Sequence, residues 1–301
     1  MRDDTASIER LSLEAPAKVN LTLRVLGARS DGYHDLESVV VAVSLFDALE
    51  FEAAPDLTLT CEGMAVPAGN ENLVMKAARR LVAQTGCRKG AHIRLTKRIP
   101  AGRGFGGGSS DAAATLLGLN ILWRTGLADE DLARLGATLG SDVPLFFGPP
   151  VAVMRGRGER LEPVDAAPGW CMVLAWPEFG LPTAEVYAAY DRLARPAAPR
   201  PAATEILHHL SPPAREAGAL LVNDLEPAAC VVRGARRDVR AILENAGAAA
   251  VGMTGSGSAY FALADTEAEA GRLAEQVRAA GVETWIATSI VDVPEQKEAS
   301  S

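Results

Sequence analysis

The 301-residue sequence is long enough to bury one large core or two medium ones, and 48% of its residues are hydrophobic, as in ordinary globular proteins. Its formal net charge of −8 argues against a nucleic-acid-binding surface, which would show an excess of lysine and arginine. The four cysteines lie far apart and form no Cys-x-x-Cys motif, which argues against a zinc site and against a disulfide framework.

Strand-like and helical patterns alternate over the first hundred residues. The chain starts Met-Arg-Asp-Asp without the apolar segment of a signal peptide, and no later apolar run approaches a membrane span. We therefore expect a cytoplasmic location. The patterns predict strands over residues 19–25, 36–46 and 92–99 and a helix over residues 72–85.

A glycine-rich loop over residues 100–111 follows the third strand. Five of the seven residues from 102 to 108 are glycine, and Ser109, Ser110 and Asp111 are good N-caps for a helix predicted over 111–124. Such a loop presents free N–H groups and the positive end of a helix dipole, which is typical of a phosphate site. A flexible loop without a ligand is the alternative, but linkers rarely join a strand to a well-capped helix.

Two common phosphate-loop patterns fit this segment poorly. No lysine follows the glycines, so the Walker pattern is absent. Gly102, Gly104 and Gly107 match the dinucleotide pattern G-x-G-x-x-G, but two residues separate the strand from the first of these glycines. The acidic residues at the expected distance, Asp129 and Glu130, start another helix instead of ending a second strand.

The remaining two thirds of the chain continue the alternation in the manner of an α+β fold. The predicted elements are a helix over 129–139, a hairpin over 151–161, a strand over 172–176, a helix over 183–193, a Pro/Ala-rich loop over 195–203, a helix from 205, a helix over 236–245, a strand over 259–263, a helix over 267–280 and a strand over 284–291. We predict a domain boundary near residue 160, which gives domains 1–160 and 161–292 and a frayed tail over 293–301.

The glycine-rich segment resembles the ATP-binding loop of the galactokinase, homoserine kinase, mevalonate kinase and phosphomevalonate kinase superfamily. Its sequence is Pro-Ala-Gly-Arg-Gly-Phe-Gly-Gly-Gly-Ser-Ser-Asp-Ala-Ala, and the triple glycine before Ser-Ser-Asp is similar to one branch, the 4-diphosphocytidyl-2-C-methyl-D-erythritol kinases. Four further segments resemble that branch in the same order: 15–21, 29–34, 139–144 and 253–259. Arg103 and Phe105 depart from the family, which usually has a small residue and a leucine there; the arginine either aids phosphate binding or points to solvent.

The resemblance implies a two-domain small-molecule kinase, with an ATP-binding first domain and the active site in the inter-domain cleft. It implies that Asp142 is the catalytic base, although its spacing to Pro144 fits a helix N-cap equally well. Lys18 would pair with Asp142 and keep the carboxylate ionised. Lys18 and Asn20 share the polar face of an alternating strand, which could also be a solvated face, and Asn20 would bind the substrate.

The resemblance also implies a cytosine site at Tyr33 and His34. The tyrosine ring would stack on the base and the histidine would read its polar edge, although a histidine beside a turn is commonly structural or solvated. Tyr187 would be a second stacking ring or a core residue. The small residues Thr254, Gly255, Ser256 and Gly257 form a second loop, which either packs against the first or contacts the substrate diphosphate.

The implied cofactors are ATP and Mg²⁺. Within the loop, ATP would be bound by Pro100, Gly102, Gly104, Gly106, Gly107, Gly108, Ser109 and Ser110. No residue is assigned as a metal ligand, since ATP and water can hold Mg²⁺.

The implied function is phosphorylation of the 2-hydroxyl of 4-diphosphocytidyl-2-C-methyl-D-erythritol, in the non-mevalonate isoprenoid precursor pathway. The alternatives are a kinase for another small alcohol and a non-catalytic nucleotide-binding protein; retention of both Lys18 and Asp142 argues against the second. We expect a small-molecule substrate, no nucleic-acid or membrane partner, and a monomer or weak homodimer.

Overall fold

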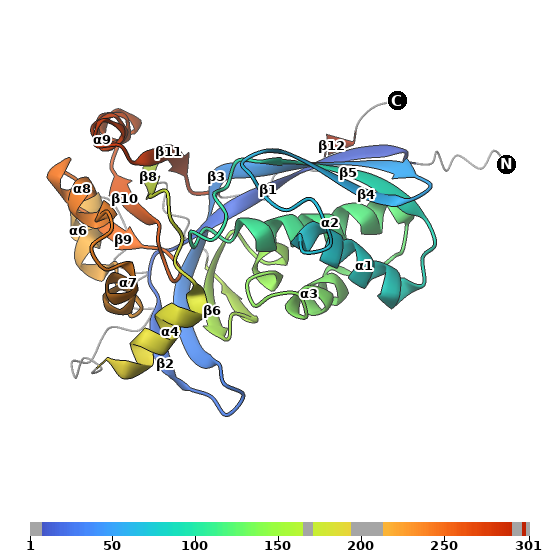
Figure 1. The fold of residues 1–301 in the computed structure, drawn as a ribbon, viewed down its shortest axis with the longest axis horizontal. Helices are drawn as coiled ribbons and strands as arrows, with labels where there is room; N and C mark the ends of the chain where they lie inside the picture. Colours follow the sequence, from blue (N-terminus) through green and yellow to red (C-terminus); the bar gives the residue numbers. More distant parts are fainter. Residues whose placement is uncertain (1–7, 165–170, 194–212, 291–296, 299–301) are drawn as a thin grey trace.

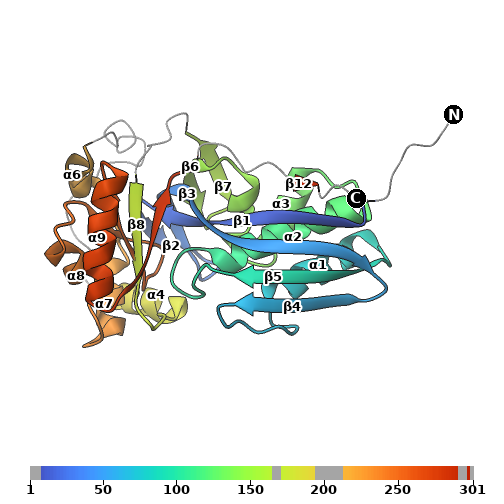
Figure 2. The same ribbon diagram turned by 90° about the horizontal axis from the view of Figure 1, so that it is seen from above.

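The computed structural model describes residues 8–164, 171–193, 213–290 and 297–298. One body of the molecule is built on an eight-stranded sheet with the order β12-β1-β3-β5-β4 (Figures 1 and 2). The short strands β2 and β6 pair with the first part of β3, and β7 pairs with β6. Its strands are β1 (Arg10–Asn20), β2 (Arg24–Ala28), β3 (His34–Ala54), β4 (Leu57–Gly63), β5 (Gly90–Lys97), β6 (Val151–Gly156), β7 (Arg160–Pro163) and β12 (Lys297–Glu298).

Three helices and a 3-10 turn cover one face of this sheet (Figure 1): α1 (Leu73–Thr85), α2 (Gly107–Trp123), α3 (Asp129–Ala137) and η1 (Pro144–Phe147). Helix α1 confirms the prediction over 72–85, because the Asn72 side chain accepts from the Val74 N–H and Gly86 ends the helix in the left-handed conformation. Helix α2 is buried along most of its length, and Gly118 allows Phe51 of β3 to pack directly on its backbone.

Helix α2 starts earlier than predicted. Its N-cap is Gly106, at φ 72°, and Ser110 donates its N–H to the Gly106 carbonyl, so the N-cap role expected for Ser109, Ser110 and Asp111 is wrong. A left-handed glycine lets the chain turn directly into the helix. At the next position a Cβ on Gly107 would lie 2.7 Å from Cγ2 of Ile99, so this glycine brings the start of α2 against the end of the preceding strand.

The second body is a four-stranded antiparallel sheet with the order β11-β8-β10-β9. Its strands are β8 (Cys171–Trp176), β9 (Val251–Met253), β10 (Tyr260–Ala264) and β11 (Glu283–Thr288), and its helical segments are α4 (Thr183–Arg192), α6 (Ala214–Ala217), η2 (Gly218–Leu220), α7 (Glu226–Arg233), α8 (Val239–Asn245) and α9 (Glu267–Ala279). The two sheets confirm the α+β class. The predicted loop over 195–203 and the start of the helix predicted from 205 lie outside the described residues.

One buried cluster joins the two bodies. It contains Val41 of β3 and Val153 of β6 together with Trp176 of β8 and Phe261 of β10. Backbone bridges link Leu23 with Asn223 and Val43 with Ser289. The division near residue 160, which falls at β7 of the larger sheet, stays a prediction.

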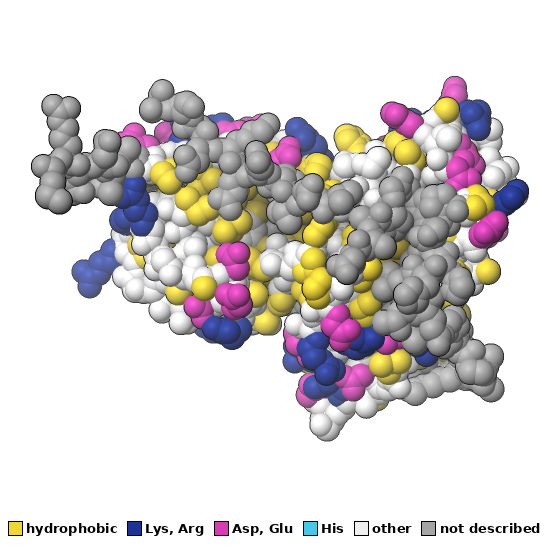
Figure 3. All heavy atoms as spheres, turned by 180° about the vertical axis from the view of Figure 1, so that it is seen from behind, with side chains coloured by type: hydrophobic (Ala, Val, Ile, Leu, Met, Phe, Trp, Pro, Cys, Tyr) yellow, Lys and Arg dark blue, Asp and Glu magenta, His cyan; other side chains and the backbone are white. Residues whose placement is uncertain are grey.

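On the face drawn in Figure 3, acidic and basic side chains are interspersed, and hydrophobic side chains gather near the middle. Among the described residues, no helix has the length and apolar character that crossing a membrane requires.

Candidate active site

Two loops of small residues meet at the centre of the molecule. The first is the glycine loop between β5 and α2, and the second runs over residues 254–258 between β9 and β10. The Ala259 N–H donates to the Arg103 carbonyl at 3.1 Å, and the Thr254 hydroxyl donates to the Gly104 carbonyl at 3.3 Å. The loops therefore pack against each other. A contact of the second loop with a substrate diphosphate stays a prediction.

Gly104 permits this approach, so we expect Gly104→Ala to disrupt it. Gly104 has φ +94°, and a Cβ there would lie 2.3 Å from the Thr254 carbonyl oxygen. The added methyl must push the loops apart, so the variant should lose at least about 2 kcal/mol of unfolding free energy, with most of its activity. Urea denaturation and a turnover assay measure the two effects.

Gly102→Ala is the matched control for that variant. Gly102 also has a positive φ, of +66°, but a Cβ there meets nothing within 4 Å. Only the backbone strain of about 1 kcal/mol should appear. Equal losses for the two variants would contradict the steric argument.

Asn20, at the end of β1, ties the second loop to the large sheet. Its side-chain oxygen Oδ1 accepts from the Gly255 N–H at 2.9 Å, and its side-chain Nδ2 donates to the Ser38 hydroxyl at 2.8 Å. Its backbone N–H donates to the Thr254 hydroxyl at 3.0 Å. The side chain is buried and engaged in protein contacts, and the substrate-binding role predicted for it stays a prediction.

Lys18 of β1 and Asp142, between α3 and η1, form an ion pair at 3.7 Å between Nζ and Oδ2 on one side of the cleft. Lys18 is 5% exposed and also donates to the Asn20 side chain, whereas Asp142 is 38% exposed and reaches solvent. The Lys18 N–H donates to the Phe105 carbonyl at 2.9 Å, which places this lysine directly beside the glycine loop. Val143, not Asp142, occupies the cap position of η1, so the N-cap interpretation of Asp142 is wrong.

Lys18 separates two cavities of different character. One, of about 170 Å³, is lined by Lys18 and Asn20 of β1, by Asp142 between α3 and η1, by Gly102, Gly104 and Gly106 of the glycine loop, and from the second body by Thr183, Tyr187 and residues 255–257. These contributions from both bodies confirm a site in the cleft between them. Among the described residues that line this cavity, Asp142 is the one carboxylate.

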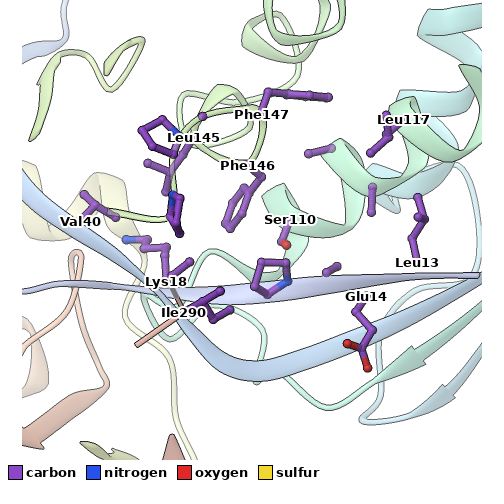
Figure 4. Close-up of a pocket in the computed structure, with 18 residues that line it drawn as sticks. Leu13, Glu14, Lys18, Val40, Ser110, Leu117, Leu145, Phe146, Phe147 and Ile290 are labelled. Carbon is purple, nitrogen blue, oxygen red and sulfur yellow. The ribbon is translucent and has the colours of Figure 1, made fainter. Parts of the chain in front are cut away.

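The other cavity, of about 120 Å³, is largely apolar (Figure 4). It lies between β1, α2 and the η1 segment, with Val40, Leu117 and Phe146 among its lining residues. Burial lowers the pKa of Lys18 below its usual 10.5, and the nearby Asp142 carboxylate opposes that shift. The apolar surroundings therefore make the Lys18 ammonium group easier to deprotonate, whereas the ion pair with Asp142 favours its protonated form.

The first turn of α2 is built to receive an anion. No side chain caps the helix at Gly106, so the N–H groups of its first residues have no capping side-chain acceptor. Gly102, Gly104 and Gly106 line the polar cavity, and Gly107, Gly108 and Ser109 form the first turn. The Ser110 hydroxyl faces the apolar cavity and has no hydrogen-bond partner among the described residues. Pro100 lines a different cavity, on the outer side of the loop.

A buried network that the sequence did not predict lies beneath the glycine loop. The Lys97 ammonium group donates to carboxylate oxygens of both Asp47 and Asp111, the second at 2.6 Å, and all three side chains are at most 4% exposed. The other oxygen of Asp47 accepts the N–H groups of Arg98 and Ile99 at 2.6 and 2.9 Å. The network thus joins β3, the end of β5 and the first turns of α2.

Asp111 within this network makes stability depend on pH. Burial raises its pKa from 3.8 to about 8; Lys97 opposes the rise and Asp47 adds to it. The folded state therefore holds a proton that the unfolded chain releases near its ordinary pKa, and stability falls as the pH rises through that interval.

Asp111→Asn carries a neutral amide at every pH and should remove this dependence. Between about pH 6 and about pH 8, the unfolding free energy of the unmodified protein should fall by about 1–2 kcal/mol more than that of the variant. Chemical denaturation at a series of pH values measures the difference. Parallel curves for the two proteins would contradict a raised pKa at Asp111.

Of the residues predicted to bind a pyrimidine, the structure brings two together. His34 is buried and stacks on Tyr187 with ring centroids 5.0 Å apart, and its Nε2 lies 2.9 Å from an Asp191 oxygen. Tyr33 is half exposed at the turn between β2 and β3, and the Arg157 guanidinium covers its ring at 4.0 Å. Tyr33 is thus not among the residues that line the polar cavity.

Sequence reasoning missed several supporting residues around the cavity. The Asn223 side chain donates to the backbone carbonyls of Met253 and Gly255 at 2.8 and 2.9 Å, and these bonds fix the start of the second loop. Thr183 was also missed, and its hydroxyl lies 2.9 Å from the hydroxyl of Ser256, which was predicted. No group of three or more metal-ligating side chains occurs in the part of the chain that the structure describes.

Comparison with known proteins gives concordant matches to two family patterns and to whole chains. The patterns described as GHMP kinases N terminal domain and GHMP kinases C terminal match residues 72–148 and 205–283. A 4-diphosphocytidyl-2-C-methyl-D-erythritol kinase of Pelotomaculum thermopropionicum is 44% identical over 257 residues, which cover 84% of this chain and 89% of that protein. One of Symbiobacterium thermophilum is 40% identical and covers 93% of this chain and 100% of its own.

Solved structures show the same relationship. A crystal structure of 4-(cytidine 5'-diphospho)-2C-methyl-D-erythritol kinase superposes with a TM-score of 0.77 at 39% identity, covering 92% of this chain and 98% of that one. The mevalonate kinase of L. major, solved with R-mevalonate, reaches a TM-score of 0.72 at 16% identity, covering 98% and 100% of the two chains. That second likeness shows the shared fold alone.

Proposed function

This chain belongs to the GHMP kinases and, within them, to the 4-diphosphocytidyl-2-C-methyl-D-erythritol kinase family, and on that premise we propose that it transfers the γ-phosphate of ATP to the 2-hydroxyl of 4-diphosphocytidyl-2-C-methyl-D-erythritol. The observation that carries the proposal is the Lys18–Asp142 pair, which lies in a cavity between the glycine loop and the second body. The reaction would serve the supply of isoprenoid precursors in the cytoplasm.

Asp142 is the proposed base, since it is partly solvated and has Lys18 beside it to favour its ionised form. Its carboxylate accepts the proton of the substrate hydroxyl as the oxygen attacks the γ-phosphorus. Lys18, held by Asn20 and Asp142, attracts the same oxygen and offsets the negative charge that develops on it. The phosphoryl group passes from ATP to the substrate oxygen and the hydroxyl proton passes to Asp142, so the products are ADP and the 2-phosphate.

The glycine loop and the first turn of α2 are the proposed triphosphate site, because no side chain caps the helix at Gly106 and the loop lies at the positive end of the helix. Mg²⁺, bound with ATP, would supply charge neutralisation at the phosphates. ATP and water would hold this cation mainly, since Mg²⁺ keeps much of its hydration shell.

The stacked pair His34 and Tyr187 is the proposed pyrimidine end of the site. Tyr187 lines the cavity, and burial together with the negative charge of Asp142 raises its pKa, so its hydroxyl keeps its proton. Asp191, at Nε2 of His34, favours the tautomer with a proton on Nε2 and leaves Nδ1 as an acceptor. An exocyclic amino group of cytosine is a suitable donor to that nitrogen.

ADP release with Mg-ATP tests the proposal directly, with 4-diphosphocytidyl-2-C-methyl-D-erythritol, mevalonate, homoserine and galactose as acceptors. We expect turnover with the cytidine compound alone. Turnover with another alcohol instead would retain the kinase and remove the pyrimidine site. ATP binding without turnover on any of the four would favour a non-catalytic nucleotide-binding protein.

A further inference from the structure

Two side chains of the glycine loop reach across to the second body. The Arg103 guanidinium donates through Nε to the Pro177 carbonyl at 3.1 Å and through Nη2 to the Glu178 carbonyl at 2.7 Å. Phe105 is fully buried and meets Trp176 edge to face, with centroids 5.9 Å apart and ring planes at 86°. Both side chains therefore hold the same three-residue segment, 176–178, which consists of the last residue of β8 and the two residues after it.

The guanidinium of Arg103 faces away from the polar cavity. Arg103 lines a separate cavity of about 330 Å³ on the outer side of the loop, together with Pro100 and Trp176. Its third contact, from Nη1 to the Ala101 carbonyl at 3.2 Å, closes the loop on itself. In this arrangement the partly exposed Arg103 guanidinium is bonded to three backbone carbonyls.

Two residues beyond that segment, the chain approaches the glycine loop too closely for any side chain at Gly180. A Cβ there would lie 2.6 Å from Nη1 of Arg103 and 2.8 Å from the Gly102 carbonyl oxygen. Beside this contact lies the outer cavity, so few other atoms support the loop from that side. Several planar donors on one guanidinium suit the task, because they fix two successive carbonyls at once.

We propose that Arg103 and Phe105 form a loop clamp: positioning residues that hold the glycine loop against residues 176–178 before ATP binds, so that its N–H groups are already arranged for the triphosphate. The inference rests on the proposed function for the identity of the ligand. The clamp reduces the conformational freedom that the loop would otherwise lose on binding. Three of the five loop residues from Gly102 to Gly106 are glycine, so the loop has a large amount of such freedom to lose.

The test compares Arg103→Ala and Arg103→Lys with the unmodified protein. The first readout is hydrogen exchange of the amides of residues 100–110 in ATP-free protein, which needs no turnover. The second is the Kd of a non-hydrolysable ATP analogue. We expect Arg103→Ala to speed the exchange and to raise the Kd, each by about tenfold, since it loses hydrogen bonds that are each individually modest. Arg103→Lys has one ammonium group in place of the planar guanidinium, so its exchange rate and its Kd should lie between those of Arg103→Ala and the unmodified protein.

Turnover and a remote control separate the clamp from a general loss of structure. The kcat at saturating ATP should stay within about threefold in Arg103→Ala, since the loop reaches the same final arrangement once ATP is bound. Arg233→Ala is the matched control, because Arg233 also donates to a backbone carbonyl, that of Arg236, at the C-terminal end of α7 and lines neither the polar nor the outer cavity. Its loop exchange and Kd should not change.

Two results would overturn the clamp. Unchanged exchange in ATP-free Arg103→Ala with a raised Kd would assign Arg103 a direct contact with bound phosphate. Unchanged exchange and unchanged Kd would show that the loop is ordered without Arg103. Neither the exchange nor the Kd measurement requires the acceptor substrate, so both test the clamp even if the proposed acceptor is wrong.

Discussion

Replacing Asp142 by asparagine should lower kcat by about 10²–10⁴-fold and leave the Kd for ATP within about threefold, because a general base typically contributes a factor of that size. The amide has nearly the shape of the carboxylate but cannot accept the hydroxyl proton, and it no longer attracts the Lys18 ammonium at 3.7 Å. Steady-state kinetics with saturating substrates give kcat, and titration calorimetry with a non-hydrolysable ATP analogue gives the Kd.

The control for that variant is Asp56→Asn, an exposed aspartate between β3 and β4 that lines neither cavity beside Lys18. Its kcat should equal that of the unmodified protein. Asp142→Asn with a kcat within threefold of the unmodified protein would exclude Asp142 as the base. A large rise in the Kd for ATP would instead assign Asp142 to nucleotide binding.

Replacing Lys97 by methionine should cost about 3–5 kcal/mol of unfolding free energy, the usual cost of removing one partner from a buried ion pair. The methionine fills much of the space of the lysine stem but leaves the buried Asp47 carboxylate without its counter-charge and Asp111 without its hydrogen-bond donor, at 0% and 4% side-chain exposure. Urea denaturation measures the loss. Since Lys97 also lies under Gly107, the glycine loop should lose order in the same variant.

Lys76→Met is the matched control for Lys97→Met. Lys76 pairs with Glu71 on the surface, with side-chain exposures of 43% and 84%, and an exposed pair is worth at most about 1 kcal/mol. Combining Lys97→Met with Asp47→Asn and Asp111→Asn should recover part of the stability, because no uncompensated charge then remains. A loss below about 1 kcal/mol in Lys97→Met would show that the network does not stabilise the fold.

The elements with strong local signals were predictable from the sequence. Helix α1 has a capping asparagine and a terminal glycine, and the hairpin of β6 and β7 turns at Gly156 and Gly158, both at positive φ. The strand β4 was missed although its Leu-Thr-Leu-Thr alternation was visible, and β9, with three residues, is too short for any periodicity.

Long-range pairing is what the sequence could not provide. Asp111 has the residue type of a helix cap, and its actual partner Lys97 is 14 positions away, with Asp47 a further 50 positions from Lys97. The stacking of Tyr33 on a base stays a prediction, and the Arg157 guanidinium over its ring is a contact that no local pattern indicates. Periodicity reports which face of an element is buried, whereas these contacts depend on how separate elements are placed.

The buried cluster that joins the two bodies restricts how the cleft can open for ligands to enter and leave. A hinge needs a joint with few contacts, but Val41, Trp176 and Phe261 pack in one buried cluster across both sheets. Opening the cleft by rotating one body against the other would have to break that packing. We therefore expect gating to be confined to α4, which carries Tyr187 at the rim, while the separation between the phosphate loop and Asp142 is set once, when the chain folds.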